Sequence, residues 1–223
     1  MALRAISGKE DSHQDPYQLT IIVKDTKDFT AYELVKTVAT SVSSFVPVWQ
    51  EAYERGSNWE EWLNGRFRKL VKRLKPSLFN KLAVQLQNDN IEYLISTGKI
   101  DLIVLAPQRK SFAPSYLKRA QLSGLSTVEG ILPTTISPES TISVLLDNSL
   151  SVSKAAVSAA HALQVAKQSI YDESGFDNFD SLLKNVDFVW KDLSDSTEYT
   201  LDIVDAGLTE VDPGTRTAAV LLS

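Results

Sequence analysis

The residues best suited to chemistry lie in the C-terminal run from Asp205 to Thr217, which reads Asp-Ala-Gly-Leu-Thr-Glu-Val-Asp-Pro-Gly-Thr-Arg-Thr. Proline fixes φ and the glycine after it accepts positive φ, so Asp212–Thr215 predicts a type II turn. Such a turn returns the chain into a final strand and brings Asp205, Thr209 and Thr217 toward one end of a sheet. A carboxylate and two hydroxyls in that place can orient water and exchange protons with it.

A second stretch places a lysine and a histidine on one helix. The pattern predicts a helix from about residue 154 to residue 170, and Lys154 and His161 share one of its faces because they are two turns apart. A lysine in the first helical turn adds to the positive end of the helix dipole. A cation there can stabilise the negative charge that builds on oxygen when water attacks an ester.

Each of these residues also has a plain structural reading, and the sequence leaves both readings open. Lysines are commonly solvated, threonines are common in strands, and aspartate before glycine is common in turns. In this alanine-rich helix, His161 also fits the role of a packed, hydrogen-bonded histidine. Both a functional and a purely structural interpretation therefore stay open for Lys154, His161, Asp205, Thr209 and Thr217.

The C-terminal run closely resembles the Asp-Ala-Gly…Thr…Pro-Gly-Thr-x-Thr ending of the second, small class of peptidyl-tRNA hydrolases. The resemblance covers roughly residues 140–223, with a shortened segment around residues 172–200. In that family the helix opens with Gly-Lys, followed by Ala-Gln and His-Ala. Lys154 and His161 keep the family's spacing here, whereas Ser153 replaces the glycine and Ser158 replaces the glutamine.

The resemblance implies hydrolysis of the ester bond of peptidyl-tRNA, which frees the tRNA for reuse, without a metal or organic cofactor. It assigns catalysis to Lys154, Asp205, Thr209 and Thr217. Substrate contacts are expected from Ser158, His161 and Thr215. Because two motif positions differ, the main alternative is a non-catalytic tRNA- or RNA-binding protein that retains the hydrolase fold. A protein-interaction module is a third option.

A local basic run favours tRNA as the partner, although the net charge of the chain is -5. Six of the ten residues from 66 to 75 are basic and none is acidic. A local concentration of charge, more than the net charge, sets the field that a phosphate backbone meets. The open alternative is an amphipathic helix over residues 59–74, with aromatic residues in the core and a solvated basic face. The residues expected to contact tRNA are Arg66, Arg68, Lys69, Lys72 and Arg73.

The order of apolar segments predicts an α/β fold made of two similar units with mixed β-sheets. We expect a mobile tail over residues 1–16, a non-catalytic unit with a basic helix over 17–106, a proline-rich linker over 107–139 and a catalytic unit over 140–223. The first strands of the two units are 123 residues apart. The two units would then form a pseudo-dimer of the peptidyl-tRNA hydrolase fold within a single chain, compatible with a monomer. The other expected elements are helices over 32–45 and 77–86 and strands over 19–23, 100–105, 142–146, 186–190, 201–204 and 216–222.

The composition disfavours several other classes of protein. The chain has no cysteine, so it can form no disulfide, and its two histidines make a zinc site improbable. No apolar run approaches the roughly 20 residues that a helix needs to span a bilayer. We therefore expect a cytoplasmic protein with no membrane contact and no metal.

Overall fold

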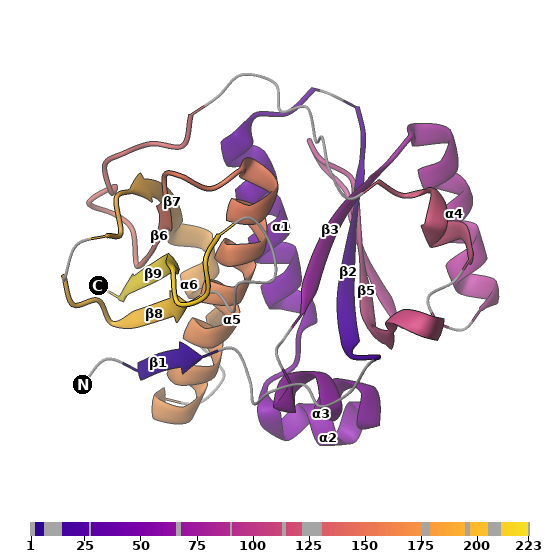
Figure 1. Cartoon of the computed structure of the whole chain (residues 1–223), viewed down its shortest axis with the longest axis horizontal. Coiled ribbons are helices and arrows are strands. Elements are labelled where there is room, and N and C mark those ends of the chain that lie inside the picture. Colours follow the sequence, from indigo (N-terminus) through magenta and orange to yellow (C-terminus); the bar gives the residue numbers. More distant parts are fainter. Residues whose placement is uncertain are drawn as a thin grey trace.

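Two mixed sheets and a helical layer between them form the body of the protein (Figure 1). The computed structural model describes residues 3–6, 15–26, 28–65, 68–89, 91–112, 115–121, 131–174, 179–194, 197–204 and 211–222. Helices α1 (Ala31–Phe45) and α5 (Val152–Ser174) lie between the sheets, and α4 (Pro76–Asn88) covers the outer face of the four-stranded sheet. The expected α/β class is confirmed.

The four strands of the first sheet and four of the five strands of the second follow one order. In the first unit it is β3-β2-β5-β4, and in the second it is β7-β6-β9-β8. Strands β3 and β2 pair in parallel, and so do β7 and β6. The other two pairings within each of these sets of four strands are antiparallel. Along the chain of each unit, the long helix comes after the first strand and before the strand that pairs with it in parallel. This shared order supports an internal repeat. The strands are β2 (Tyr17–Lys24), β3 (Lys69–Leu74), β4 (Tyr93–Ser96), β5 (Leu102–Arg109), β6 (Ile142–Asp147), β7 (Val186–Lys191), β8 (Leu201–Val204) and β9 (Arg216–Leu222).

Helix α1 forms where the sequence predicts it. The Glu33 N–H donates to Thr30 Oγ1 at 3.2 Å, and the Thr30 N–H donates to Glu33 Oε2 at 2.7 Å. This reciprocal capping box satisfies two backbone donors at the helix start. The helix ends at Phe45, just before Pro47, which cannot continue a helix.

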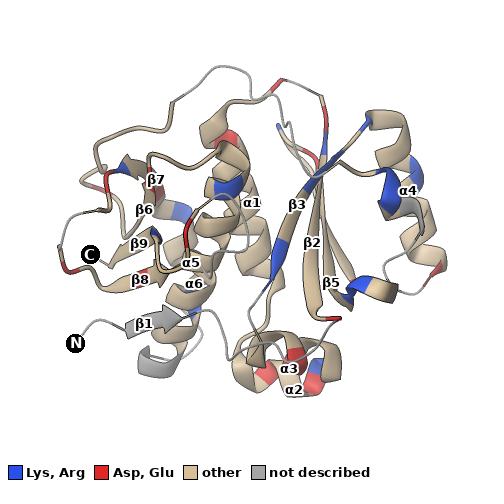
Figure 2. Cartoon of the chain, viewed as in Figure 1, with Lys and Arg blue, Asp and Glu red and all other residues tan. Residues whose placement is uncertain are grey.

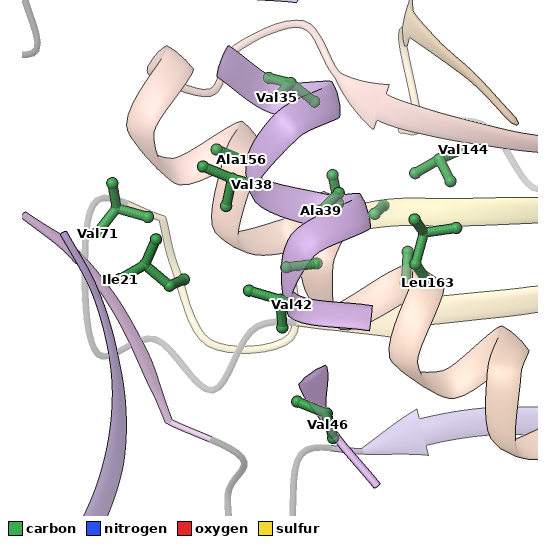
Figure 3. Close-up of a cluster of buried hydrophobic side chains, with 14 of the residues drawn as sticks. Ile21, Val35, Val38, Ala39, Val42, Val46, Val71, Val144, Ala156 and Leu163 are labelled. Carbon is green, nitrogen blue, oxygen red and sulfur yellow. The ribbon is translucent and has the colours of Figure 1, made fainter. Parts of the chain in front are cut away.

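The two units share one core. Valines of α1 lie between Ile21 and Val71 of the first sheet and Val144 and Leu163 of the second unit (Figure 3). Helix α5 carries six buried alanines, whose small size lets it approach α1 and the second sheet closely. Each helix also contacts a strand of the other unit: α1 contacts β7, and α5 contacts the equivalent strand β3. Equivalent elements of the two units therefore make the contacts between them.

The expected helix over residues 59–74 is wrong, and with it the basic helix of the first unit. Helix α3 (Ser57–Asn64) ends before Gly65, and the basic residues that follow lie on strand β3. Strand β3 pairs in parallel with β2 from Leu19 and Lys69 to Lys24 and Leu74. Apolar residues at 70, 71 and 74 fit a helical period as well as a strand, so the pairing with β2 decides between them.

Two other boundaries also differ from expectation. Residues 3–6, expected in a mobile tail, form strand β1 (Leu3–Ile6), which pairs in parallel with β8. In the expected linker over 107–139, β5 continues to Arg109, and the short helices η1 (Lys110–Phe112) and η2 (Ser115–Arg119) follow. The remaining short elements are α2 (Trp49–Arg55), α6 (Phe179–Leu182) and η4 (Leu183–Asn185). In the described part of the chain, no helix has the length and apolarity needed to cross a membrane.

Candidate functional site

Four chain segments meet at one edge of the second sheet, where β6 ends, α5 begins, β8 ends and β9 begins. Leu146 pairs with Ala218, and Val204 pairs with Arg216, so the end of β6 and the end of β8 flank the start of β9. The loop from Asp147 leads directly into α5. We refer to this region as the β6–β9 edge.

Lys154 lies in the first turn of α5, beside this edge. The Lys154 N–H donates to Ser151 Oγ at 3.3 Å, and the Ala155 N–H donates to the Ser151 carbonyl at 2.8 Å. Ser151 therefore caps the helix and fixes the position of the residue that bears the amine. The Lys154 side chain is half-buried.

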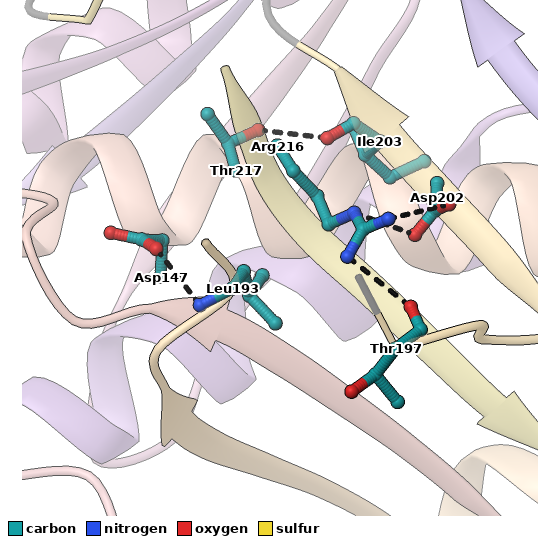
Figure 4. Close-up of polar contacts among 7 residues, drawn as sticks. All are labelled: Asp147, Leu193, Thr197, Asp202, Ile203, Arg216 and Thr217. Atoms are coloured by element: carbon teal, nitrogen blue, oxygen red, sulfur yellow. Dashed lines mark hydrogen bonds and ion pairs between the residues drawn. The ribbon is translucent and has the colours of Figure 1, made fainter. Parts of the chain in front are cut away.

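Asp147 holds the loop between β6 and α5, a role that the sequence analysis missed. Its Oδ1 accepts hydrogen bonds from the Ser149 hydroxyl and, at 3.0 Å, from the Ser149 N–H. Its Oδ2 accepts from the Leu193 N–H at 3.2 Å, which ties the loop to the segment after β7 (Figure 4). The only sequence signal was an aspartate directly after a buried strand.

The expected turn at the start of β9 is present. The Thr215 N–H donates to the Asp212 carbonyl at 3.1 Å, and Gly214 has a φ of 87°, as the third residue of a type II turn requires. The turn delivers Thr217, which is 1% exposed, to the edge. The Thr217 Oγ1 donates to the Ile203 carbonyl at 3.5 Å, across a bulge in the β8–β9 pairing (Figure 4).

A second acidic residue missed by the sequence analysis anchors the start of β9. Asp202 is 4% exposed, and its Oδ1 lies 3.1 Å from Arg216 Nε. Arg216 Nη2 donates to Asp202 Oδ2 at 3.3 Å, and Nη1 donates to the Thr197 carbonyl (Figure 4). The guanidinium also lies 5.3 Å from the centre of the Tyr199 ring. These contacts hold the strand that bears Thr217.

The structure does not bring every expected site residue to the edge. Ser158 is one helical turn, about 6 Å, further along α5 than Lys154, and it is 2% exposed. His161 is one turn further still and is half-buried. Asp205, Thr209 and Arg66 lie outside the described residues.

The equivalent edge of the first unit carries different chemistry. Glu33, the third residue of α1, takes the place of Lys154, the third residue of α5. An ion pair with Lys99 and the Thr30 N–H hold the pKa of Glu33 below its usual value. Lys24 pairs with Asp101 at 2.8 Å beside it. The first unit therefore presents an acid, engaged in an ion pair, where the second presents a lysine.

The basic run divides between the interior and the surface. Lys69 is 6% exposed, its Nζ donates to Gln164 Oε1 at 2.6 Å, and it lies 4.8 Å from the centre of the Trp62 ring. Burial holds the pKa of Lys69 well below its usual value. The expectation that Lys69 contacts tRNA is therefore wrong, because its amine points into the contact between the units.

The other described residues of the run differ in their access to solvent. Arg73 pairs with Asp25 at 3.1 Å. The Arg68 side chain is half-buried, and its backbone carbonyl accepts from Trp62 Nε1 at 2.9 Å. Lys72 is half-buried, and this partial burial lowers its pKa. A strand sends alternate side chains to opposite faces, so the run does not form one basic surface.

No protein-family model matches this chain, and no curated protein matches it. Over the described ranges, no group of three or more histidine, cysteine, aspartate or glutamate side chains is arranged to hold a metal ion.

The chemistry available at the β6–β9 edge comes from side chains. Lys154 supplies a cation in the first turn of a helix whose dipole is positive at that end. Thr215 supplies a hydroxyl group near the start of β9, whereas the buried Thr217 hydroxyl donates to the Ile203 carbonyl and can only accept a further hydrogen bond. Such a set can bind an oxyanion or a phosphate oxygen and can hold a water molecule.

Proposed function

We propose that the second unit hydrolyses the ester bond of peptidyl-tRNA at the β6–β9 edge. One observation carries this proposal: the two stretches that resemble the hydrolase family meet at the same edge of the same sheet. Lys154 reaches the edge on α5, and Thr217 reaches it on β9 through the Asp212–Thr215 turn. The two stretches are far apart in the sequence, and each one alone gives weaker support to the proposed function.

The proposed reaction is attack of water on the ester carbonyl. The carbonyl oxygen becomes negative as the carbon–oxygen bond to water forms, and the Lys154 ammonium stabilises that charge. Asp205 orients the lysine or takes the proton from water, and the threonine hydroxyls Thr209 and Thr217 position the water. The bond to the ribose oxygen then breaks, and that oxygen gains a proton. The products are a free peptide and tRNA.

The repeated topology supports a pseudo-dimer in which the first unit is silent. The resemblance implies a family that works as a homodimer, and the two units here pack through equivalent helices and strands. Glu33 in place of a lysine gives the first unit a charge that repels an oxyanion. On this proposal one chain combines a silent partner with one catalytic site.

The test is release of an N-blocked amino acid from tRNA by the purified protein. We expect Lys154→Ala and Asp205→Ala each to lower turnover by more than about tenfold, because a charged catalytic group typically contributes two or more orders of magnitude. The matched control is Lys184→Ala, an exposed lysine of the same unit. Circular dichroism would check that each variant is folded. Unchanged ester cleavage in both site variants would refute the assignment.

The second candidate function is tRNA binding without turnover. Ser158, in place of the family's glutamine, is buried and shorter than an amide side chain. The loss of that amide removes a group that can orient water. Salt-dependent binding of tRNA with no ester release would favour tRNA binding without turnover over ester hydrolysis.

A further inference from the structure

Charge is strongly segregated along this chain. Residues 66–88 and 102–121 contain eleven lysines and arginines and no aspartate or glutamate. The rest of the chain carries twelve basic and 28 acidic residues. The net charge of -5 therefore combines one strongly basic portion with a strongly acidic remainder.

The two basic segments come together on the outer side of the four-stranded sheet. Leu117 of η2 and Ala120, which follows η2, pack in the same cluster as Leu74 of β3 and Phe79 of α4. The Arg73 N–H donates to the Gln121 carbonyl at 2.9 Å, and the Gln121 N–H donates back at 3.1 Å. These contacts bring η2 and the residue Gln121 after it beside β3, although Arg73 and Gln121 are 48 positions apart in the sequence.

The exposed basic side chains in this region come from three elements. Lys75 joins β3 to α4, Lys81 lies on α4, and Lys118 and Arg119 lie on η2. All four are exposed, and Lys72 of β3 is half-buried beside them. We name the set of Lys72, Lys75, Lys81, Lys118 and Arg119 the basic face; Figure 2 shows lysine and arginine on this side of the molecule.

Two described carboxylates of the first unit pair with bases outside the basic face. Asp25 pairs with Arg73, and Asp101 pairs with Lys24, and neither of these two bases belongs to the face. No acidic residue occurs in β3, in α4 or in η2. Among the residues that the structure describes, no ion pair joins a side chain of the basic face to a carboxylate.

We propose that the basic face binds the phosphate backbone of an RNA helical stem, that of the tRNA whose ester the second unit hydrolyses. The identity of this RNA rests on the proposed function. Strand β3 ends, and α1 and α5 begin, at the same end of the molecule (Figure 1), so the face and Lys154 can meet one elongated ligand. A single small phosphate cannot span two units, whereas a nucleic-acid stem presents charge along its length.

Phosphate contacts of this kind give binding a steep dependence on salt. Each phosphate neutralised by a lysine or arginine releases counterions, and the slope of log K against log salt changes by roughly 0.7 to 0.9 per contact. The contacts carry little sequence information, so the face would bind different tRNAs with similar affinity.

The experiment measures binding of fluorescently labelled, deacylated tRNA by anisotropy over a range of salt concentrations. The variants are Lys118→Gln with Arg119→Gln, and Lys75→Gln with Lys81→Gln. The control replaces Lys184 by Gln, since this exposed lysine of the second unit precedes β7 and lies at the opposite end of that strand from the β6–β9 edge. We expect each test pair to weaken binding several-fold and to flatten the salt slope by about 1 to 2. The control should bind as the unchanged protein does.

Three results would each refute the proposal that the basic face binds tRNA. They are no binding of tRNA by the unchanged protein, equal binding by the test and control variants, and binding to anionic phospholipid vesicles in place of tRNA. Deacylated tRNA carries no aminoacyl or peptidyl ester, so this test is independent of the proposed hydrolysis. Binding that depends on the face without any ester release would support the face and refute the proposed catalysis.

Discussion

At the residue scale, Lys69 makes stability depend on pH. Its pKa is held well below the usual value by burial, so the folded protein binds fewer protons at this site than the unfolded chain. Stability is therefore gained as pH rises through the depressed pKa and levels off near the ordinary lysine value. Below the depressed pKa, the folded state must either bury a charge or open the contact with Gln164.

This behaviour can be measured against a variant that removes both partners, Lys69→Met with Gln164→Leu. The quantity is the free energy of unfolding in urea, determined at several pH values for both proteins. Between the depressed pKa of Lys69 and the ordinary lysine pKa, we expect the free energy of unfolding of the unchanged protein to rise relative to that of the variant. The expected rise is up to about 1.4 kcal/mol per pH unit. A difference that stays constant from about pH 6 to pH 10 would show that Lys69 titrates normally.

At the element scale, the end of α1 depends on a lysine from the other unit. Helix α1 has no basic residue in its own last turn. Lys167 of α5 supplies one, because its Nζ donates to the Ser43 carbonyl at 3.0 Å and to the Val46 carbonyl at 2.9 Å. Cations near a helix C-terminus bind its unpaired carbonyls and interact favourably with the dipole.

Lys167→Met should therefore destabilise the protein by about 1 to 3 kcal/mol, the usual cost of leaving buried acceptors without a donor. Hydrogen exchange should accelerate in residues 42–48 before it changes elsewhere in α1. Lys184→Met serves as the surface control and should alter neither quantity. Equal exchange in residues 42–48 of both variants would show that the contact does not hold the helix end.

The elements differ in how far their own sequence determines them. The helices at α1, α4 and α5 and most strands follow from local periodicity, caps and prolines. Strand β3 does not, because its apolar positions fit two periods, and only the distant pairing with β2 decides between them. Its identity therefore needed the three-dimensional structure.

The site shows the same division between local and long-range information. Lys154 and the turn before Thr217 could be located from motif spacing, and the structure brings their elements to one edge. The ion pair of Asp202 with Arg216 could not be located, because it joins two strands and has no local signal. The same holds for the pair of Lys69 and Gln164, which depends on how the two units pack.

At the scale of the whole molecule, the shared core predicts that the two units unfold together. Trp49, Trp59 and Trp62 belong to the first unit, and Trp190 is the one tryptophan of the second. In a Trp190→Phe variant, tryptophan fluorescence therefore reports the first unit alone, whereas far-ultraviolet circular dichroism reports both.

Since α1 and α5 bury much of their apolar surface against each other, neither unit keeps a complete core without its partner. We expect the two urea transitions to coincide in midpoint and slope. Transitions that separate, with fluorescence changing at a different urea concentration from circular dichroism, would mean that each unit folds independently and that the helical layer is only a docking contact.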